Sequence, residues 1–205
     1  IMSASFNVGE AETVYIGGGT PSLMSSEQVD VILQTVQKRF GIADGAEITM
    51  EVNPGTVKDG YYAQLKAVGV NRLSMGVQSF VDEELRVIGR IHNAEEAKLS
   101  FLSAREAEFE NISLDLIFGL PGQTMTSWRK SLKAIEALKP DHLSIYSLIL
   151  EPGTPLTKLI EKGIVQLPDD DLVADMFEET MDYLDRIGYE HYEISSWAID
   201  ESRES

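Results

Sequence analysis

The chain has 205 residues, of which 43% are apolar and 25% charged, and this composition suits a single soluble globular domain. Its 34 acidic residues outnumber its 17 basic ones, and the net charge of −17 argues against nonspecific nucleic-acid binding, which needs a basic patch. The absence of cysteine excludes disulfides and thiolate metal sites, and without an 18-residue apolar run or a signal-like start we expect a cytoplasmic protein with no transmembrane segment.

Short apolar runs alternate with amphipathic helical stretches along the chain. Strands are predicted at 13–16, 47–52, 72–76, 112–117 and 142–148, and a last strand is predicted at about 189–194. Helices are predicted from Ser26, as an N-cap, to residue 40, and at about 58–68, 82–88, 94–107, 126–138 and 170–187. Strands that begin roughly every 30 residues are typical of βα units, which form a parallel sheet. Their near-continuous apolar runs predict a sheet that is covered on both faces.

Polar or glycine-rich groups follow nearly every predicted strand. They are Gly17-Gly18-Gly19-Thr20, then Glu51 and Asn53, then Gln78, then Asp115, then Tyr146 and Ser147. In barrels and open α/β sheets alike, ligands bind at the carboxyl ends of the strands. We therefore predict a barrel or partial barrel with its site on this rim.

Three of these features are candidates for ligand contact. The glycine run at 17–19 leaves backbone N–H groups free for an anion or carboxylate, although a tight structural turn would use the same residues. Glu51 offers a carboxylate to a ligand ammonium or ribose hydroxyl, or is a solvated strand end. Asp115 lies in an apolar strand and needs a partner, which favours the barrel interior or rim over solvent.

The remaining polar residues carry weaker signals. Gln78 offers both a donor and an acceptor, and Arg90 suits a carboxylate but also suits a surface or capping role. His92, His142 and His191 lack the short spacing of a metal site, so each is predicted to be structural. No Gly-x-Ser-x-Gly nucleophile motif is present.

Taken in order, the motifs resemble the radical S-adenosylmethionine (SAM) superfamily, in the group of HemW-type heme chaperones and oxygen-independent coproporphyrinogen III oxidases. The resemblance extends from about residue 13 to 198. Its motifs are Gly17-Gly18-Gly19-Thr20-Pro21-Ser22, Glu51-Val52-Asn53-Pro54-Gly55-Thr56, Arg72 to Phe80, Gly89-Arg90-Ile91-His92, Asp115 to Thr124, Glu151-Pro152-Gly153-Thr154-Pro155-Leu156 and Tyr192-Glu193-Ile194-Ser195.

The resemblance implies a partial (β/α)6 barrel of TIM-like type. In that family a Cys-x3-Cys-x2-Cys loop after the first strand holds a 4Fe-4S cluster, and one-electron reduction cleaves SAM to a 5′-deoxyadenosyl radical. By resemblance, Gly18, Gly19 and Thr20 hold the methionine end of SAM, and Glu51 binds it from the next strand. Positions that match Gln78, Arg90 and Asp115 contact a second SAM in the related oxidases, and Ile149 matches a further position near SAM.

The same resemblance implies a role in heme metabolism. A HemW-type chaperone binds heme and passes it to acceptor proteins, whereas the oxidases decarboxylate two propionates of a porphyrinogen. The runs Gly-Leu-Pro-Gly-Gln-Thr, Glu-Pro-Gly-Thr-Pro and Val-Gln-Ser-Phe favour the HemW type. A catalytically inactive module that binds heme or a nucleotide is the alternative from another class.

The chain departs from the family pattern at its cysteine motif, which is missing together with the first βα unit. We therefore interpret it as a central fragment, with a cluster-free relative as the alternative, and expect neither cluster binding nor SAM cleavage by this chain. The expected organisation is a radical SAM core over residues 1–199 and a frayed tail over 200–205. Without a preceding strand, the 13–16 strand would present a bare edge, which predicts self-association.

Overall fold

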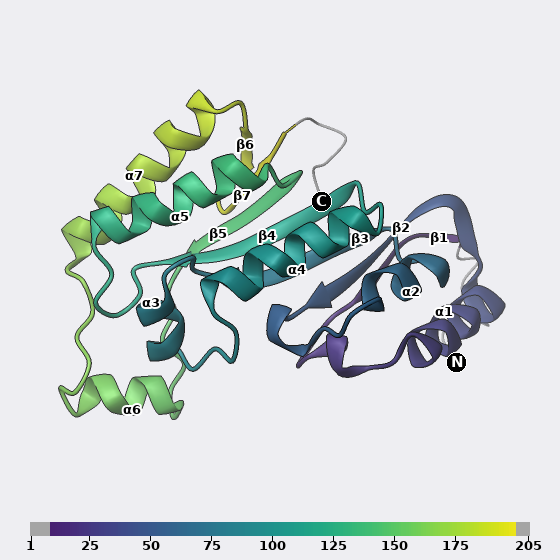
Figure 1. The fold of residues 1–205 in the computed structure, drawn as a ribbon, viewed down its shortest axis with the longest axis horizontal. Coiled ribbons are helices and arrows are strands. Elements are labelled where there is room, and N and C mark those ends of the chain that lie inside the picture. Colours follow the sequence, from purple (N-terminus) through teal and green to yellow (C-terminus); the bar gives the residue numbers. More distant parts are fainter. Residues whose placement is uncertain (1–8, 200–205) are drawn as a thin grey trace.

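The computed structural model describes residues 9–199 and contains one seven-stranded sheet (Figure 1). The predicted tail at 200–205 lies outside the described residues, as do residues 1–8. The sheet order is β1-β2-β3-β4-β5-β7-β6, and the first five strands are parallel neighbours. These five strands are β1 (Ala11–Ile16), β2 (Ile42–Val52), β3 (Arg72–Gln78), β4 (Asn111–Phe118) and β5 (His142–Ser147).

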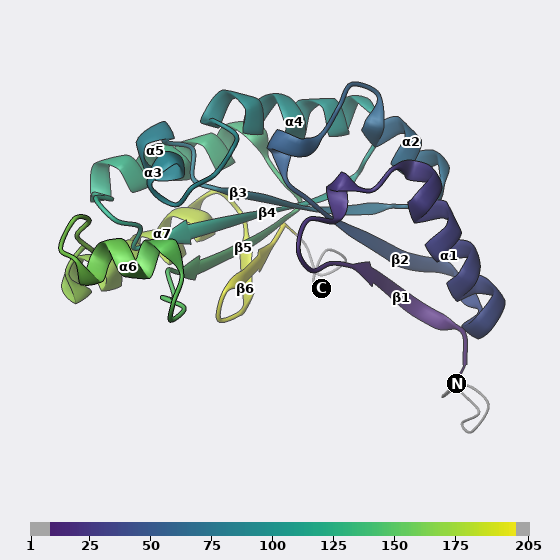
Figure 2. The same ribbon diagram turned by 90° about the horizontal axis from the view of Figure 1, so that it is seen from below.

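The sheet curves into an arch, and helices cover only its convex face (Figure 2). Helices α1, α2, α4 and α5 lie along the outside of the arch, while the concave face carries no helix among the residues from 9 to 199. The prediction of cover on both faces was therefore wrong. The strands curl into a half-barrel, so one face packs against helices and the other faces the open lumen, as the alternative prediction of a partial barrel requires.

Six of the seven α-helices in residues 9–199 begin and end close to their predicted positions, whereas α6 was not predicted. They are α1 (Ser26–Phe40), α2 (Tyr61–Ala67), α3 (Asp82–Val87), α4 (Ala94–Glu106), α5 (Met125–Leu138), α6 (Pro155–Glu161) and α7 (Asp170–Arg186). The N-cap of α1 is Ser25 rather than Ser26, because the Ser25 hydroxyl accepts the N–H of Gln28 while the Gln28 side chain accepts the N–H of Ser25. Gly41, at φ 78°, ends this helix.

The hydrophobic core lies between the convex face and the helices. Met50, Leu73 and Leu114 on three adjacent strands are fully buried, and so is Trp128 on α5. The Trp128 indole N–H donates to the Thr180 hydroxyl at 2.9 Å, which ties α5 to α7 without leaving a buried donor unpaired.

The C-terminal edge of the sheet differs from the predicted parallel continuation. The predicted last strand exists as β6 (Glu190–Glu193), but β7 (Ser196–Ala198) inserts between it and β5, and both of its pairings are antiparallel. A two-residue turn at Ile194 and Ser195 joins β6 and β7, and such a hairpin forms only antiparallel pairs. None of the helices in residues 9–199 is long and apolar enough to cross a membrane.

Candidate functional site

Polar side chains occupy the concave face because strand alternation sends the apolar ones to the helices. In the register of the sheet, Glu51 on β2 lies opposite Ser74 on β3, and Gly76 lies opposite Asp115 on β4. Asp115 in turn lies opposite Ser144 on β5. These residues form a polar band across the carboxyl-terminal half of the lumen.

A cavity of about 250 Å³ opens at the carboxyl ends of β1 to β5. We call it the rim cavity. Six of the eight predicted site residues line it, namely Gly19, Thr20, Glu51, Gln78, Arg90 and Asp115. Gly18 contacts the cavity wall through Glu51. Ile149 does not line the cavity, and its side chain is 74% exposed on the loop after β5.

The glycine loop after β1 is closed by Glu51. Gly18 and Gly19 have φ values of 88° and 65°, a region that residues with a Cβ rarely adopt. The Glu51 carboxylate accepts the Gly18 N–H at 3.0 Å through Oε2 and the Tyr15 hydroxyl at 3.0 Å through Oε1. A Cβ on Gly17 would lie 2.8 Å from Glu51 Oε1, so the loop needs glycine here to approach the carboxylate closely.

Two carboxylates dominate the charge of the rim cavity. Asp115 accepts the Ser74 hydroxyl at 3.0 Å, and burial raises the pKa of the Asp115 carboxyl to about 6. Burial, followed by the hydrogen bond to Glu51, raises the pKa of the Tyr15 hydroxyl to about 12. A cationic ligand would relieve the cost of holding Asp115 and Glu51 so close, which makes the cavity suited to a ligand with positive charge.

Gln78 and Arg90 add unmet hydrogen-bonding groups to the same cavity. Gln78 is a non-glycine residue at φ 69°, and its buried Oε1 has no hydrogen-bond partner within residues 9–199. Arg90 donates from Nη2 to the Gly76 carbonyl at 2.7 Å, whereas its buried Nε has no partner within the same range. Burial also lowers the pKa of Arg90. A ligand with its own donors and acceptors would satisfy both groups.

The sequence did not assign six residues of the cavity wall as ligand contacts, namely Pro21, Val52, Asn53, Ser74, Gly76 and Tyr146. For Ser74 and Gly76 the sequence indicated only a strand, and for Tyr146 only a polar group at a strand end. Alternation was the signal that could have found Ser74, because it lies two residues before Gly76, on the same face of β3, and Gly76 pairs with Asp115. The cavity wall therefore includes residues of β2, β3, β4 and β5 and of the loop after β1.

Each of the three histidines contacts other protein groups. His92 lies against Asn53 and Val77, and buried His142 bonds the hydroxyls of Ser113 and Tyr192. His191 stacks on Trp197, with ring centroids 4.3 Å apart. In the described part of the chain, no group of three or more His, Cys, Asp or Glu residues could hold a metal ion.

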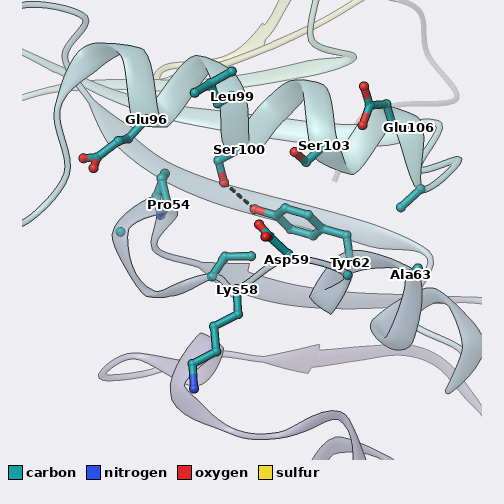
Figure 3. A pocket seen from close by; sticks show the side chains of 14 residues that line it. Pro54, Lys58, Asp59, Tyr62, Ala63, Glu96, Leu99, Ser100, Ser103 and Glu106 are labelled. Atoms are coloured by element: carbon teal, nitrogen blue, oxygen red, sulfur yellow. Dashed lines mark hydrogen bonds between the residues drawn. The ribbon is translucent and has the colours of Figure 1, made fainter.

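A second groove, of about 580 Å³, lies on the outer side of the half-barrel between α2 and α4 (Figure 3). Tyr62 and Ser100 are hydrogen-bonded across its floor, and the acidic side chains of Asp59, Glu96 and Glu106 surround it. None of the predicted site residues lines this groove. Its hydroxyl pair is already satisfied, so it lacks the unmet polar groups that distinguish the rim cavity.

Comparison with known families agrees with this geometry. The family model of the Radical SAM superfamily matches residues 1–135. The chain belongs to the radical SAM superfamily. It is 40% identical to the heme chaperone HemW of Lactococcus lactis over 95% of this chain and 52% of that protein. It is 42% identical to HemW of Escherichia coli, over 92% of this chain and 49% of that protein.

A solved structure of a radical SAM enzyme has the same fold as this chain. Coproporphyrinogen III oxidase (HemN) from Escherichia coli, described as a radical SAM enzyme, superposes with a TM-score of 0.82 and 31% identity, covering 94% of this chain and 44% of that one. The partial TIM-like barrel that the motifs implied is thus confirmed. The chain spans about half the length of the curated relatives it matches.

The residues present differ in how well they fit the two cofactors of a radical SAM protein. SAM is a sulfonium with an amino-acid end, and the rim cavity offers carboxylates, a glycine loop and unmet donors and acceptors that suit such a ligand. A 4Fe-4S cluster is held by cysteine thiolates, and this sequence has no cysteine. The 205 residues therefore fit SAM and do not fit the cluster.

Proposed function

We propose that this chain is the SAM-binding core of a HemW-like protein that acts in heme trafficking. The observation that supports it best is the rim cavity, where Glu51, Gln78, Arg90 and Asp115 meet the glycine loop. The relatives at 40–42% identity carry the name heme chaperone, and this similarity favours the heme-trafficking role over an oxidase.

In this proposal each part of the cavity meets a different part of SAM. The glycine loop of Gly18, Gly19 and Thr20 would face the methionine end, with Glu51 accepting from its ammonium. The Asp115 carboxylate, on the concave face of the sheet, would stabilise the positive charge of SAM. Gln78 and Arg90 would supply the acceptor and donor that are unmet without a ligand.

SAM supplies the radical chemistry for which the superfamily is named when it is bound beside a reduced cluster. Because this chain offers no thiolate for a cluster, we propose that it binds and orients SAM without cleaving it. Ile149 contributes to binding only if the exposed loop after β5 moves onto the ligand. Reconstitution with iron and sulfide tests the first point, since a chelator-sensitive chromophore on the purified chain would contradict it.

Isothermal titration of the purified chain with SAM tests the proposed site. We expect saturable one-site binding that Glu51→Ala weakens roughly tenfold or more, since the variant loses a charge-assisted contact. Glu83→Ala is the matched control, because it removes the same charge from an exposed position on α3. Equal binding by both variants, or no binding by the wild type, would reject SAM as the ligand of the rim cavity.

A separate titration with heme tests the role in trafficking. Heme binding with a shifted Soret band supports a HemW-like function, and transfer of that heme to apo-acceptor proteins would identify the partners. Binding of a porphyrinogen in preference to heme would favour the oxidase alternative. Heme binding without any affinity for SAM would favour the inactive heme-binding module.

Self-association through β1 is part of the same proposal. Within the described residues β1 pairs only with β2, so its other edge offers unpaired backbone groups to another strand. We expect a concentration-dependent increase in mass by light scattering, and a monomer at every concentration would contradict it.

A further inference from the structure

Gln78 has a strained backbone conformation and lines the rim cavity. It is at φ 69°, which costs energy for any residue with a Cβ, and the β3–β4 register slips between Gly76 and Gln78. Its buried Oε1 has no partner within residues 9–199, so nothing bonded to the side-chain oxygen holds it in place. A strained residue persists only where its surroundings fix it.

The residue before Gln78 is fixed by His92. The His92 ring contacts the Val77 carbonyl through Nε2 at 3.1 Å and the Asn53 side-chain oxygen through Nδ1 at 3.2 Å. His92 is buried, and burial lowers its pKa. It therefore connects the end of β2 to the end of β3 immediately beside Gln78.

The residue after Gln78 is fixed by Glu84. The Ser79 hydroxyl donates to Glu84 Oε2 at 2.6 Å, and the Gln123 side-chain N–H donates to the same oxygen at 2.9 Å. Ser79 Oγ also accepts the Val81 N–H at 3.0 Å, and Gln123 Oε1 accepts the Leu120 N–H at 3.2 Å. Glu84 thus joins the loop after β3 to the Gly-Leu-Pro-Gly-Gln-Thr loop after β4.

Burying the Glu84 carboxylate costs free energy, so its position in the fold calls for an explanation. The exposed fractions are 4% for Glu84, 0% for Ser79 and 2% for Gln123. Glu84 forms no ion pair with any residue from 9 to 199, and its Oε1 has no hydrogen-bond partner there. A buried carboxylate without a counter-charge is expensive, so a gain elsewhere has to explain it.

We infer that Glu84 and His92 are positioning residues that hold Gln78 from both sides, with its side-chain carbonyl ready to accept from a bound ligand. The gain is pre-organisation, since the acceptor is already fixed before the ligand arrives. This inference rests on the proposed function in one respect: it takes SAM as the ligand whose affinity reports on Gln78.

Hydrogen exchange tests the fixing of Gln78 without any ligand. Three amides mark the segment: Ser79 N–H donates to the Val77 carbonyl at 2.9 Å, Phe80 N–H to Ser131 Oγ at 3.1 Å, and Val81 N–H to Ser79 Oγ. Glu84→Ala should speed their exchange about tenfold, the effect of losing one buried hydrogen-bond partner. Glu83→Ala, with the same charge change at an exposed site, should leave them unchanged.

An exchange of side chains gives a rescue that a merely structural role would not show. Glu84→Gln leaves a buried amide N–H without an acceptor, and Gln123→Glu brings two carboxylates together, so each should weaken SAM binding about tenfold. In the double variant the amide at position 84 donates to the carboxylate at position 123. That variant should recover amide protection and an affinity within about threefold of the wild type. His92→Ala, which removes the contact with the Val77 carbonyl, should speed the exchange of the same amides as Glu84→Ala does.

The outcomes separate the two proposals. If the wild type does not bind SAM, the proposed function fails, and the exchange of the three amides still decides whether Glu84 fixes this segment. If Glu84→Ala raises exchange evenly across the whole core, the residue supports global stability only and the inference is overturned. Failure of the double variant to restore protection would overturn it as well.

Discussion

Glu51 Oε2 accepts the backbone N–H of Gly18 at 3.0 Å, so a carboxylate at the end of β2 closes the glycine loop that follows β1. Its other oxygen accepts the Tyr15 hydroxyl. Both oxygens of one side chain therefore connect two strands at the place where a ligand would bind. Changes at Glu51 should be visible at Tyr15 even before a ligand is added.

Glu51→Gln is expected to lower the pKa of Tyr15 from about 12 toward 10. The carboxylate favours the protonated phenol by accepting its hydrogen bond and by its charge, and glutamine removes the charge. The pKa should stay above 10, because burial is the larger cause and is unchanged. Ultraviolet difference titration against the Tyr15→Phe variant isolates this hydroxyl, and an unaltered titration curve would contradict the prediction.

Asp115 should make folding less favourable as the pH rises from about 4 to about 6. Its pKa is about 6 in the folded chain against 3.8 for the unfolded carboxyl, so the folded state binds more protons in this range. The stabilising effect is complete below the unfolded value and is lost as pH rises through the folded one. Between pH 4 and 7, wild-type protein should lose about 2 kcal/mol of unfolding free energy relative to Asp115→Asn. Denaturant unfolding at both pH values measures this difference, and a constant difference would exclude the raised pKa.

His142 should have the opposite effect over nearly the same range. Burial and the charge of Arg72 lower its pKa from 6.5 to about 4, so here the unfolded state binds more protons. Stability is complete above 6.5 and falls as pH drops through the folded value, and wild type should lose about 3 kcal/mol relative to His142→Asn on going from pH 7 to 4. The contributions of Asp115 and His142 to the pH dependence of stability have opposite signs and nearly cancel in the wild type. The pH dependence due to one residue therefore becomes visible when the other is substituted, and a double variant with a pH profile parallel to the wild type would confirm the cancellation.

The sequence was sufficient for the parallel half of the fold because each βα unit carries its own local signals. Four of the first five strands and most helices begin near the predicted positions, since apolar periodicity and Gly or Pro stops act within a few residues. The start of β2 was missed because Asp44-Gly45 resembles a turn, yet Ile42 pairs with Ala11 across a bulge. β7 was missed because a strand of three residues is too short to show an alternating pattern.

The candidate site was predictable only in part, for a related reason. Motifs identified residues at strand ends, and six of those eight line the rim cavity. The fixing of Gln78 by Glu84 could not be predicted, because Glu84 belongs to an ordinary acidic first turn of α3 beside Asp82 and Glu83. Its burial is a consequence of how the loops after β3 and β4 meet. Ile149 was assigned through resemblance alone, and it is exposed and does not line the cavity.

Gly76→Ala should disturb the rim cavity with little effect on the rest of the fold. A Cβ at this position would lie 2.9 Å from Gln78 Nε2 and 3.1 Å from Arg90 Nη2, so both side chains would have to shift. Gly76 does not have a left-handed φ, and alanine is therefore not strained by the backbone itself. We expect the unfolding free energy to fall by about 1–2 kcal/mol, as for a small overpacking change, and SAM affinity to fall about tenfold.

Gly9→Ala is the control for this variant, because nothing lies within 4 Å of a Cβ there and its φ is also outside the left-handed region. Chemical denaturation and calorimetric titration of both variants separate stability from binding. Since the Arg90 guanidinium donates to the Gly76 carbonyl at 2.7 Å, its displacement should also free that carbonyl. Wild-type SAM affinity in Gly76→Ala would mean that neither Gln78 nor Arg90 contacts the ligand, and the binding site would then have to lie on the Glu51 side of the cavity alone.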